Sequence, residues 1–461
     1  MSVRRSAGTI FWGLALVAIG GLLLARNLGY PIPIWTHIAR YWPALLIAWG
    51  LLKFIDYYRF RKTGDARPLF TGGEVALLIF VIIAGSAITT ASNISPDFGD
   101  VFRIGDLDLW DITGNNFTFD EHLEQNVPSG STIQIINLYG SVDVRPSESD
   151  RVILDVSKTV RASDKEEAGR LSGDFTFQIK NEGSIYRIVS NRDDAAGAAS
   201  RPGARQRFKS SLTIQVPRQS ALSIDNRNGQ VTVQDLTGKQ TIVNKYGSVD
   251  VRGVTGELNV DNRNGNVNVQ DVTESVTINN SYSGTTVKNI GGSIEIRNRN
   301  GAVDVSGVKG NAAISNSYAS ISVDNVEGEL TVTGRNNGLD IEHVQGGLKA
   351  ESSYQNVSIS DARGGVSLNS RNGDLYLSFE RPPEKDISVS NRYGNVRIVL
   401  PSASSFSIDA RTEYGEVDSE FENIDRSRSN RDASLRGRNG RGGPRITITT
   451  RNGNIELSRR G

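Results

Sequence analysis

Hydrophobic and polar residues alternate in short runs, and from Ala221 to about residue 382 these runs recur with a constant period of eighteen residues. In the copy at 257–274, ELNVDNRNGNVNVQDVTE, apolar residues occupy the second, fourth, eleventh, thirteenth and sixteenth positions. Such alternation, broken by Asn-Gly or Gly, is typical of strands and turns. Eighteen residues are too few for a βαβ crossover. The pattern therefore predicts an all-β fold, a parallel β-solenoid (β-helix) with 18-residue coils stacked about 4.8 Å apart.

The sixth position of the coil is usually Asn, and it shares its parity with the inward apolar positions. We therefore expect this side chain inside the solenoid, at a bend. Identical stacked amides can hydrogen-bond along the stack, as Asn ladders do in cross-β structures. The sequence thus predicts a structural ladder without a chemical role. Its members are Asn226, Asn244, Asn262, Asn280, Asn298 and Asn316, with Asn391 following later.

The seventh and eighth positions alternate from coil to coil, with Arg-Asn in one copy and Tyr at the eighth position of the next. One explanation of this alternation is packing. Tyr on every second coil spaces the rings about 9.6 Å apart, with Asn-Gly turns of positive φ between them. The other is a binding stripe, in which guanidinium groups meet anionic sugars or phosphates and Tyr faces meet sugar rings. These residues, here called the corner column, are Arg227, Arg263, Arg299, Arg335 and Arg371 with Tyr246, Tyr282, Tyr318 and Tyr354.

The regions on either side of the regular coils, 221–382, are less periodic. Residues 95–220 predict a linker and an irregular start of the β-domain, with one short helix for which Ser163 is a candidate N-cap and a low-complexity loop at 190–208. Residues 383–461 predict irregular C-terminal coils with a basic loop at 424–444. This loop fits either a solvated, disordered segment or a contact with an anionic polymer.

Three apolar runs, at about 10–25, 42–55 and 75–91, dominate the first 94 residues. Each is about long enough, with its flanks, to cross the hydrocarbon core of a bilayer, so 1–94 is predicted to be a membrane anchor of three transmembrane helices. Basic residues precede the first run and crowd the segment between the second and third. The positive-inside rule then predicts a cytoplasmic N-terminus, a multi-pass protein of the cytoplasmic membrane and an exported β-domain.

Composition narrows the function. The 52 Lys and Arg residues nearly balance the 51 Asp and Glu residues, which argues against a nucleic-acid partner, and Cys is absent. His37, His122 and His343 lie far apart without ligand spacing, so no metal site and no cofactor are expected. Acidic positions vary between copies, and phosphate loops, nucleophile elbows and calcium-binding nonapeptides are absent. The sequence therefore predicts no catalytic residues and no enzyme activity.

Two stretches resemble known families. The run VPRQSALSIDNRNGQVTVQDLTGKQTIVNKYGSVDVRGVTG resembles the bacterial putative-adhesin family, a domain of unknown function, and the likeness covers about 115–461. That resemblance implies a β-solenoid related to the heads of exported surface proteins and carries over no catalytic residue. The segments TIFWGLALVAIGGLLLARNLGY and YWPALLIAWGLLKF are similar to the transmembrane region of LiaF-type envelope-stress proteins. Members of that family usually have helix pairs, from which the third apolar run departs.

Two non-catalytic functions remain open. In the first, the chain is a membrane-anchored, adhesin-like binding or structural element of the bacterial cell envelope, whose partners are the lipid bilayer and an anionic envelope polymer or glycan. In the second, it is an envelope-stress sensor or regulator that works through its transmembrane helices on another membrane protein. The first predicts that the exported part binds envelope polymers. The second predicts that the helices are required for any phenotype.

Overall fold

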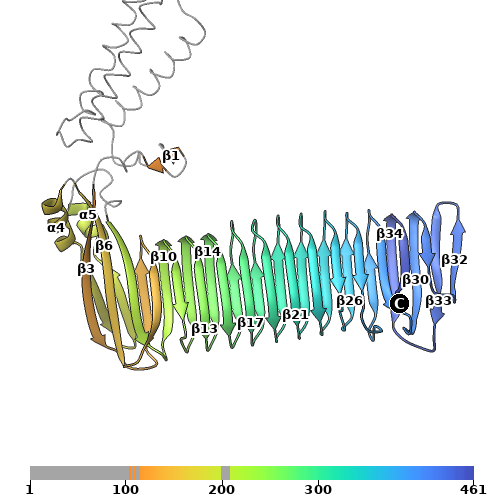
Figure 1. Cartoon of the computed structure of the whole chain (residues 1–461), viewed down its shortest axis with the longest axis horizontal. Coiled ribbons are helices and arrows are strands. Elements are labelled where there is room, and N and C mark those ends of the chain that lie inside the picture. Colours follow the sequence, from red (N-terminus) through yellow and green to blue (C-terminus); the bar gives the residue numbers. More distant parts are fainter. Residues whose placement is uncertain (1–102, 105–106, 109–114, 163, 199–207, 461) are drawn as a thin grey trace, which may run out of the picture. The chain divides into compact units, whose positions relative to one another are not determined.

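The computed structural model describes residues 103–104, 107–108, 115–162, 164–198 and 208–460 (Figure 1). The three apolar runs predicted to cross the membrane lie outside these residues. Within them, no helix combines the length and the apolar character that a membrane crossing needs. Strands β1 (Arg103–Ile104) and β2 (Leu107–Asp108) form a small antiparallel pair. All other described elements belong to one compact β-domain.

The β-domain consists of two long sheets, and each regular coil contributes one strand to each (Figure 1). The first sheet contains, in spatial order, β7 (Phe177–Glu182), β8 (Ile185–Ser190), β4 (Thr132–Asn137), β10 (Ala221–Asn228), β12 (Gln240–Tyr246), β14 (Leu258–Asn264), β16 (Val276–Asn279), β18 (Ile294–Arg297), β20 (Ala312–Asn316), β22 (Leu330–Gly334), β24 (Leu348–Ser352), β26 (Val366–Ser370), β28 (Ile387–Ser390), β34 (Arg445–Asn452), β30 (Phe406–Tyr414), β33 (Asp432–Asn439) and β32 (Ile424–Ser429). The second sheet contains β3 (Asn115–Asn126), β6 (Arg151–Ala162), β9 (Phe208–Pro217), β5 (Val142–Ser147), β11 (Val231–Gln234), β13 (Val249–Val254), β15 (Val267–Val272), β17 (Thr285–Ile290), β19 (Val303–Val308), β21 (Ile321–Val326), β23 (Leu339–Val344), β25 (Val357–Ser360), β27 (Leu375–Ser378), β29 (Val396–Pro401), β35 (Ile455–Arg460) and β31 (Val417–Ser419).

Neighbouring regular coils pair in parallel and with no shift in register. Leu258 lies beside Gln240 on one side and Val276 on the other, each eighteen residues away. The predicted all-β fold with parallel strands and 18-residue coils is therefore confirmed.

The apolar core lies between the two sheets. In the coil at 257–274, Val267 and Val269 face inward from the second sheet and are at most 2% exposed. Each such side chain contributes roughly 1.5–3 kcal/mol when it leaves water, so the stacked coils are held together mainly by this continuous core.

The N-terminal end of the solenoid is closed by antiparallel strands. β8 and β9 add one more coil beside β4 and β5; β7 pairs antiparallel with β8, β6 pairs antiparallel with β9, and β3 pairs antiparallel with β6. The short helix is present as α4 (Lys165–Asp174), but its N-cap is Asp164, which accepts a hydrogen bond from the backbone N–H of Glu167, rather than Ser163. The segment expected to be a low-complexity loop begins with a second helix, α5 (Arg192–Ala198).

The C-terminal end departs from sequence order. The last coil of the chain, β34 and β35, is inserted between the coil of β28 and β29 and the coil of β30 and β31. The segment 424–444 is not the expected disordered loop, because most of it forms β32 and β33, a hairpin that pairs antiparallel with β30. Four of its eight charged side chains form ion pairs; for example, the guanidinium group of Arg426 lies 2.6 Å from the Asp418 carboxylate and that of Arg436 lies 3.2 Å from the Asp409 carboxylate. These charged strands protect the open edge of the stack.

Candidate binding face at the first corner

The first corner of each coil is the turn that follows a strand of the first sheet, at positions six to ten. The sixth-position Asn side chains are buried there, as expected. Their partners differ from the expected ladder: the Nδ2 group of Asn262 donates to the backbone carbonyls of Gly265 in its own coil and Gly247 in the preceding coil, at 2.8 and 3.2 Å. Amide-to-amide hydrogen bonds join only Asn137, Asn226 and Asn244 among the described residues. The Asn therefore acts mainly as a clamp on turn carbonyls that the sheets leave unpaired.

One coil keeps the clamp but moves it along the chain. Here the sixth position is Gly334, and Asn337, three residues later, is buried and donates to the backbone carbonyl of Asn316. A Cβ atom at Gly334 would lie 2.2 Å from the Oδ1 atom of Asn337, so glycine is required where the neighbouring amide folds inward. The signal for this shift in the sequence is the change from NRNG to GRNNG.

The Tyr side chains of the corner column point outward. Tyr246, Tyr282, Tyr318 and Tyr354 are between 46% and 57% exposed, and no aromatic or cation–π contact involves them within the described residues. The predicted positive φ of the Asn-Gly turn is present at Gly265, with +136°, and Gly247 after Tyr246 has a similar φ of +133°. Ser283 and Ala319, which follow the next two tyrosines, do not have positive φ.

The alternation of Asn and Tyr continues through both ends of the stack. In sequence order the last members are Tyr393, Tyr414 and Asn452, which breaks the alternation. In space, Asn452 lies between the two tyrosines, because β34 is inserted there. The spatial order of the eighth position is Tyr139, Asn228, Tyr246, Asn264, Tyr282, Asn300, Tyr318, Asn336, Tyr354, Asn372, Tyr393, Asn452 and Tyr414.

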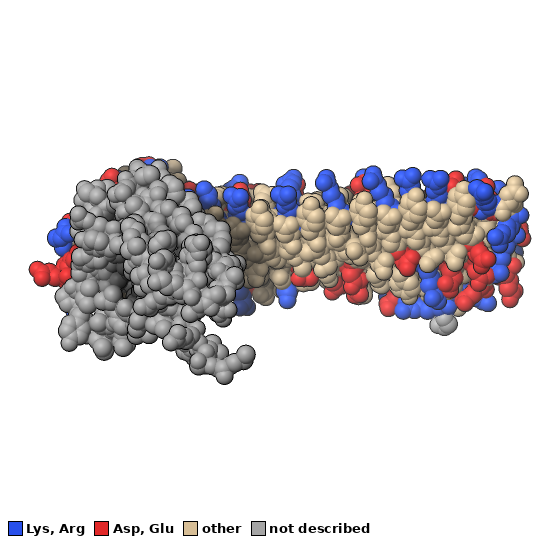
Figure 2. Space-filling view, turned by 90° about the horizontal axis from the view of Figure 1, so that it is seen from above, with Lys and Arg blue, Asp and Glu red and all other residues tan. Residues whose placement is uncertain are grey.

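The Arg side chains of the corner column are exposed and have no ion pair or side-chain hydrogen bond within the described part of the chain. Arginines elsewhere on the coils are often paired, such as Arg252 with Asp271 at 3.6 Å and Arg397 with Glu456 at 3.4 Å. In Figure 1, β10 and β14 point upward, so the view from above in Figure 2 looks onto the first corner. It shows a surface with few charges, bordered along one long edge by a regular row of Lys and Arg side chains.

Small uncharged residues lie next to the column. The tenth position of the coil is Asn266, Gly284, Ala302, Ser320 and Gly338 in successive copies. None of these side chains rises far from the backbone, so they leave room beside the neighbouring Tyr rings. The first corner therefore combines unpaired cations, accessible aromatic rings and a flat surface of small uncharged side chains. This combination suits an extended anionic ligand.

The second corner, before the chain returns to the first sheet, is built differently. Its fifteenth position has positive φ in all eight coils of 221–364 and is Asp, Asn, His or Gly, as at Asp271 with +58° and Gly307 with +70°. Short polar residues and glycine tolerate this left-handed conformation better than other types.

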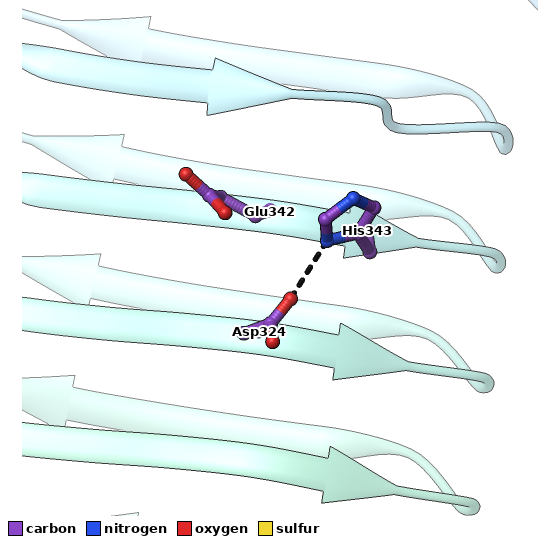
Figure 3. A group of neighbouring side chains, drawn as sticks. All are labelled: Asp324, Glu342 and His343. Carbon is purple, nitrogen blue, oxygen red and sulfur yellow. Dashed lines mark hydrogen bonds and ion pairs between the residues drawn. The ribbon is translucent and has the colours of Figure 1, made fainter. Parts of the chain in front are cut away.

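At the second corner the structure brings His343 next to acidic residues that sequence spacing did not connect. Its Nδ1 atom lies 2.8 Å from the Oδ1 atom of Asp324 in the preceding coil, with Glu342 beside it (Figure 3). The hydrogen bond that the His343 ring donates to the Asp324 carboxylate raises the pKa of His343 above its ordinary value of 6.5. The ligand atoms of the three residues lie within 4.8 Å of one another, although no metal ligand set was expected. Asp324 and His343 are exposed and already bonded to each other, so we assign the cluster no metal.

Comparisons with known proteins agree with this architecture. A family model described as Toastrack DUF4097 matches residues 131–458, and one described as the LiaI-LiaF-like transmembrane region matches residues 10–54. No curated protein matches the chain. A solved structure described as a putative cell adhesion protein from Clostridium sporogenes is 9% identical and covers 75% of this chain and 100% of its own, with a TM-score of 0.16. That score is too low to support a conclusion about function.

Proposed function

The chain belongs to the Toastrack DUF4097 family, and we propose that its β-domain is a non-catalytic, adhesin-like binding element of the bacterial cell envelope. The match of residues 10–54 to a transmembrane region associates the chain with a membrane. We further propose the orientation that the basic residues favour, with a cytoplasmic N-terminus, three crossings and an exported β-domain.

The observation that carries the proposal is the unpaired row of corner-column arginines. An exposed arginine near a carboxylate commonly forms an ion pair, as Arg252 and Arg397 do. Five regularly placed guanidinium groups without such partners instead leave a positive edge free for an external anion. Because Arg binds carboxylates and phosphates with two parallel hydrogen bonds, this edge suits an anionic envelope polymer.

A second function is favoured by a different observation. The LiaI-LiaF-like match covers the first two apolar runs and points to a sensor or regulator that contacts another membrane protein through its helices. In that case the β-domain would report on the envelope, and the signal would pass through the membrane segment.

Co-sedimentation separates the two proposals. The full-length protein in lipid nanodiscs is mixed with insoluble envelope polymer at low and high salt, beside a control that lacks the β-domain. The binding proposal predicts that the full-length protein sediments with the polymer at low salt and is released at high salt, because salt screens exposed charges. If full-length protein and control remain equally in solution under both conditions, the binding proposal is wrong and the regulator becomes the better explanation.

A further inference from the structure

The corner column has a repeat of two coils rather than one. Arg occurs at the seventh position of every second coil, and Tyr occurs at the eighth position of the coils between them. Strands stack about 4.8 Å apart, so each kind of side chain recurs about every 9.6 Å along the solenoid. The seventh position of the regular Tyr coils is Ser281, Ser317 or Ser353, except in the first of these coils, where it is Lys245. From Arg263 to Arg371 the face therefore presents one cation and one aromatic ring per two coils.

This repeat is kept where the chain order would have broken it. Placing β34 between β28 and β30 sets Asn452 between Tyr393 and Tyr414, so no two tyrosines are neighbours in the stack. A simple continuation of the chain would have placed the coils of Tyr393 and Tyr414 side by side. Packing of large rings contributes to this order, but packing alone does not require an exposed Tyr in every second coil.

The rings at the two ends of the column each have a guanidinium group over the ring, whereas the described structure shows none over the rings in the middle. The guanidinium group of Arg192 lies 4.3 Å from the centre of the Tyr139 ring. At the other end, Arg392 and Arg431 lie 5.7 and 5.5 Å from the rings of Tyr393 and Tyr414. The open stretch thus runs over seven stacked coils and contains four rings, which are Tyr246, Tyr282, Tyr318 and Tyr354.

We infer that the first corner binds a linear polysaccharide that lies parallel to the solenoid axis, with a disaccharide repeat and one carboxylate per disaccharide. An extended disaccharide is close in length to two coils. Each carboxylate then meets one guanidinium group of the Arg row, and the apolar face of the uncharged sugar packs on one Tyr ring. A polymer with a carboxylate on every sugar would place half of its charges opposite coils that carry no Arg. The inference rests on the proposed binding function and specifies its ligand.

Ligand length provides the first test. Full-length protein in nanodiscs is titrated with hyaluronan fragments, in which glucuronate alternates with N-acetylglucosamine, and with polygalacturonate fragments, which carry a carboxylate on every sugar. Affinity for hyaluronan should rise roughly a hundredfold from the disaccharide to the octasaccharide and then level off, because four open rings are filled. Polygalacturonate of equal charge should bind at least about tenfold more weakly, since half of its carboxylates face coils that carry no Arg.

Coil deletions provide a matched control for register. Removing 275–310, two coils, leaves the alternation intact and should keep binding of a hyaluronan hexasaccharide within about threefold of the wild type. Removing only 275–292, one coil, joins two Arg-Asn coils and should weaken hexasaccharide binding at least tenfold, although it leaves a longer solenoid. Circular dichroism and thermal unfolding verify that both variants are folded.

The outcomes separate this inference from the proposed function. Equal affinity for the two polymers, or equal binding by the two deletion variants when both are folded, would overturn the disaccharide register. If the protein binds envelope polymer through the Arg row but binds neither hyaluronan nor polygalacturonate, the proposed ligand class is wrong and the proposed binding function stands. If neither probe nor envelope polymer binds, both proposals fail.

Discussion

The two corners of each coil solve the same problem, reversing the chain between the sheets, by different means. The first corner uses a buried Asn amide to clamp the carbonyls of two turns, as Asn262 does, and projects Arg or Tyr outward. The second corner relies on a left-handed residue in each coil of 221–364, such as Asn325 with a φ of +59°. The first corner therefore frees its outer positions for large side chains, while the backbone conformation of the second restricts the residue types that it can accept. This difference explains why we place ligand binding at the first corner.

The largest loss of stability is expected from the substitution Gly265→Ala at the first corner. Its Cβ atom would lie 2.1 Å from the carbonyl oxygen of Gly247, and its φ of +136° disfavours any side chain. We expect a loss of about 3 kcal/mol or more in the free energy of unfolding, measured by denaturant titration. Gly347→Ala is the control, because a Cβ atom there has nothing within 4 Å. Equal destabilisation by both changes would contradict the account of the first corner.

The next largest loss of stability is expected when one of the Asn clamps of the first corner is removed. Asn262→Leu keeps the side-chain volume but removes two hydrogen bonds, to the carbonyls of Gly247 and Gly265, each of which keeps a second amide donor from a neighbouring coil. Each lost hydrogen bond contributes about 0.5–1.5 kcal/mol, so the variant should unfold at a temperature a few degrees lower than the wild type. Asn259→Leu, in the same strand but pointing outward, should change stability by less than about 0.5 kcal/mol. A harmless Asn262→Leu would show that the clamp is dispensable.

At the second corner, the prediction concerns backbone conformation. Asn325→Ala should cost about 1 kcal/mol, because alanine is strained at a φ of +59°. Asn325→Gly should cost at most a few tenths of that amount, since glycine adopts this conformation freely. Denaturant titration of the two variants gives the comparison, and a less stable glycine variant would show that the side chain matters more than φ.

The smallest effect is a pH dependence at the second corner. Hydrogen bonding to Asp324 raises the pKa of His343 above 6.5, so the protonated form stabilises the fold. That contribution should be complete between about pH 5 and pH 6.5 and should disappear as the pH rises through the folded-state pKa. Both side chains are 53% exposed, so the effect is small. Thermal unfolding of wild type and Asp324→Asn across this range should differ at low pH and converge at high pH; a constant difference would contradict the assignment.

The sequence predicted the repeating architecture well, because parity and period fix which side chains face the core. Val267 and Val269 are buried as expected, and their neighbours eighteen residues away lie beside them. The partners of the inward amides were not predictable, because the direction of a turn carbonyl depends on backbone angles. The sequence placed Asn262 inside, but the clamp on Gly247 and Gly265 needed the structure.

The ends of the solenoid were less predictable for a different reason. The segments around Phe406 and Arg445 both carry a coil pattern, and local pattern does not decide which of them stacks on β28. The hairpin that covers β30 favours that coil at the outer edge. The contact between His343 and Asp324 likewise joins residues in successive coils, which spacing along one element cannot reveal.

The central claim is that the first corner is the binding face, and one comparison tests it most directly. The variant R263S/R299S/Y282S/Y318S changes the first corner, whereas R252S/R397S/Y376S changes exposed residues of the second sheet. Both are measured as full-length proteins for retention on envelope polymer at low salt. The account predicts that the corner variant loses at least about tenfold in affinity while the control stays within about twofold of the wild type. Equal binding by the two variants would contradict it.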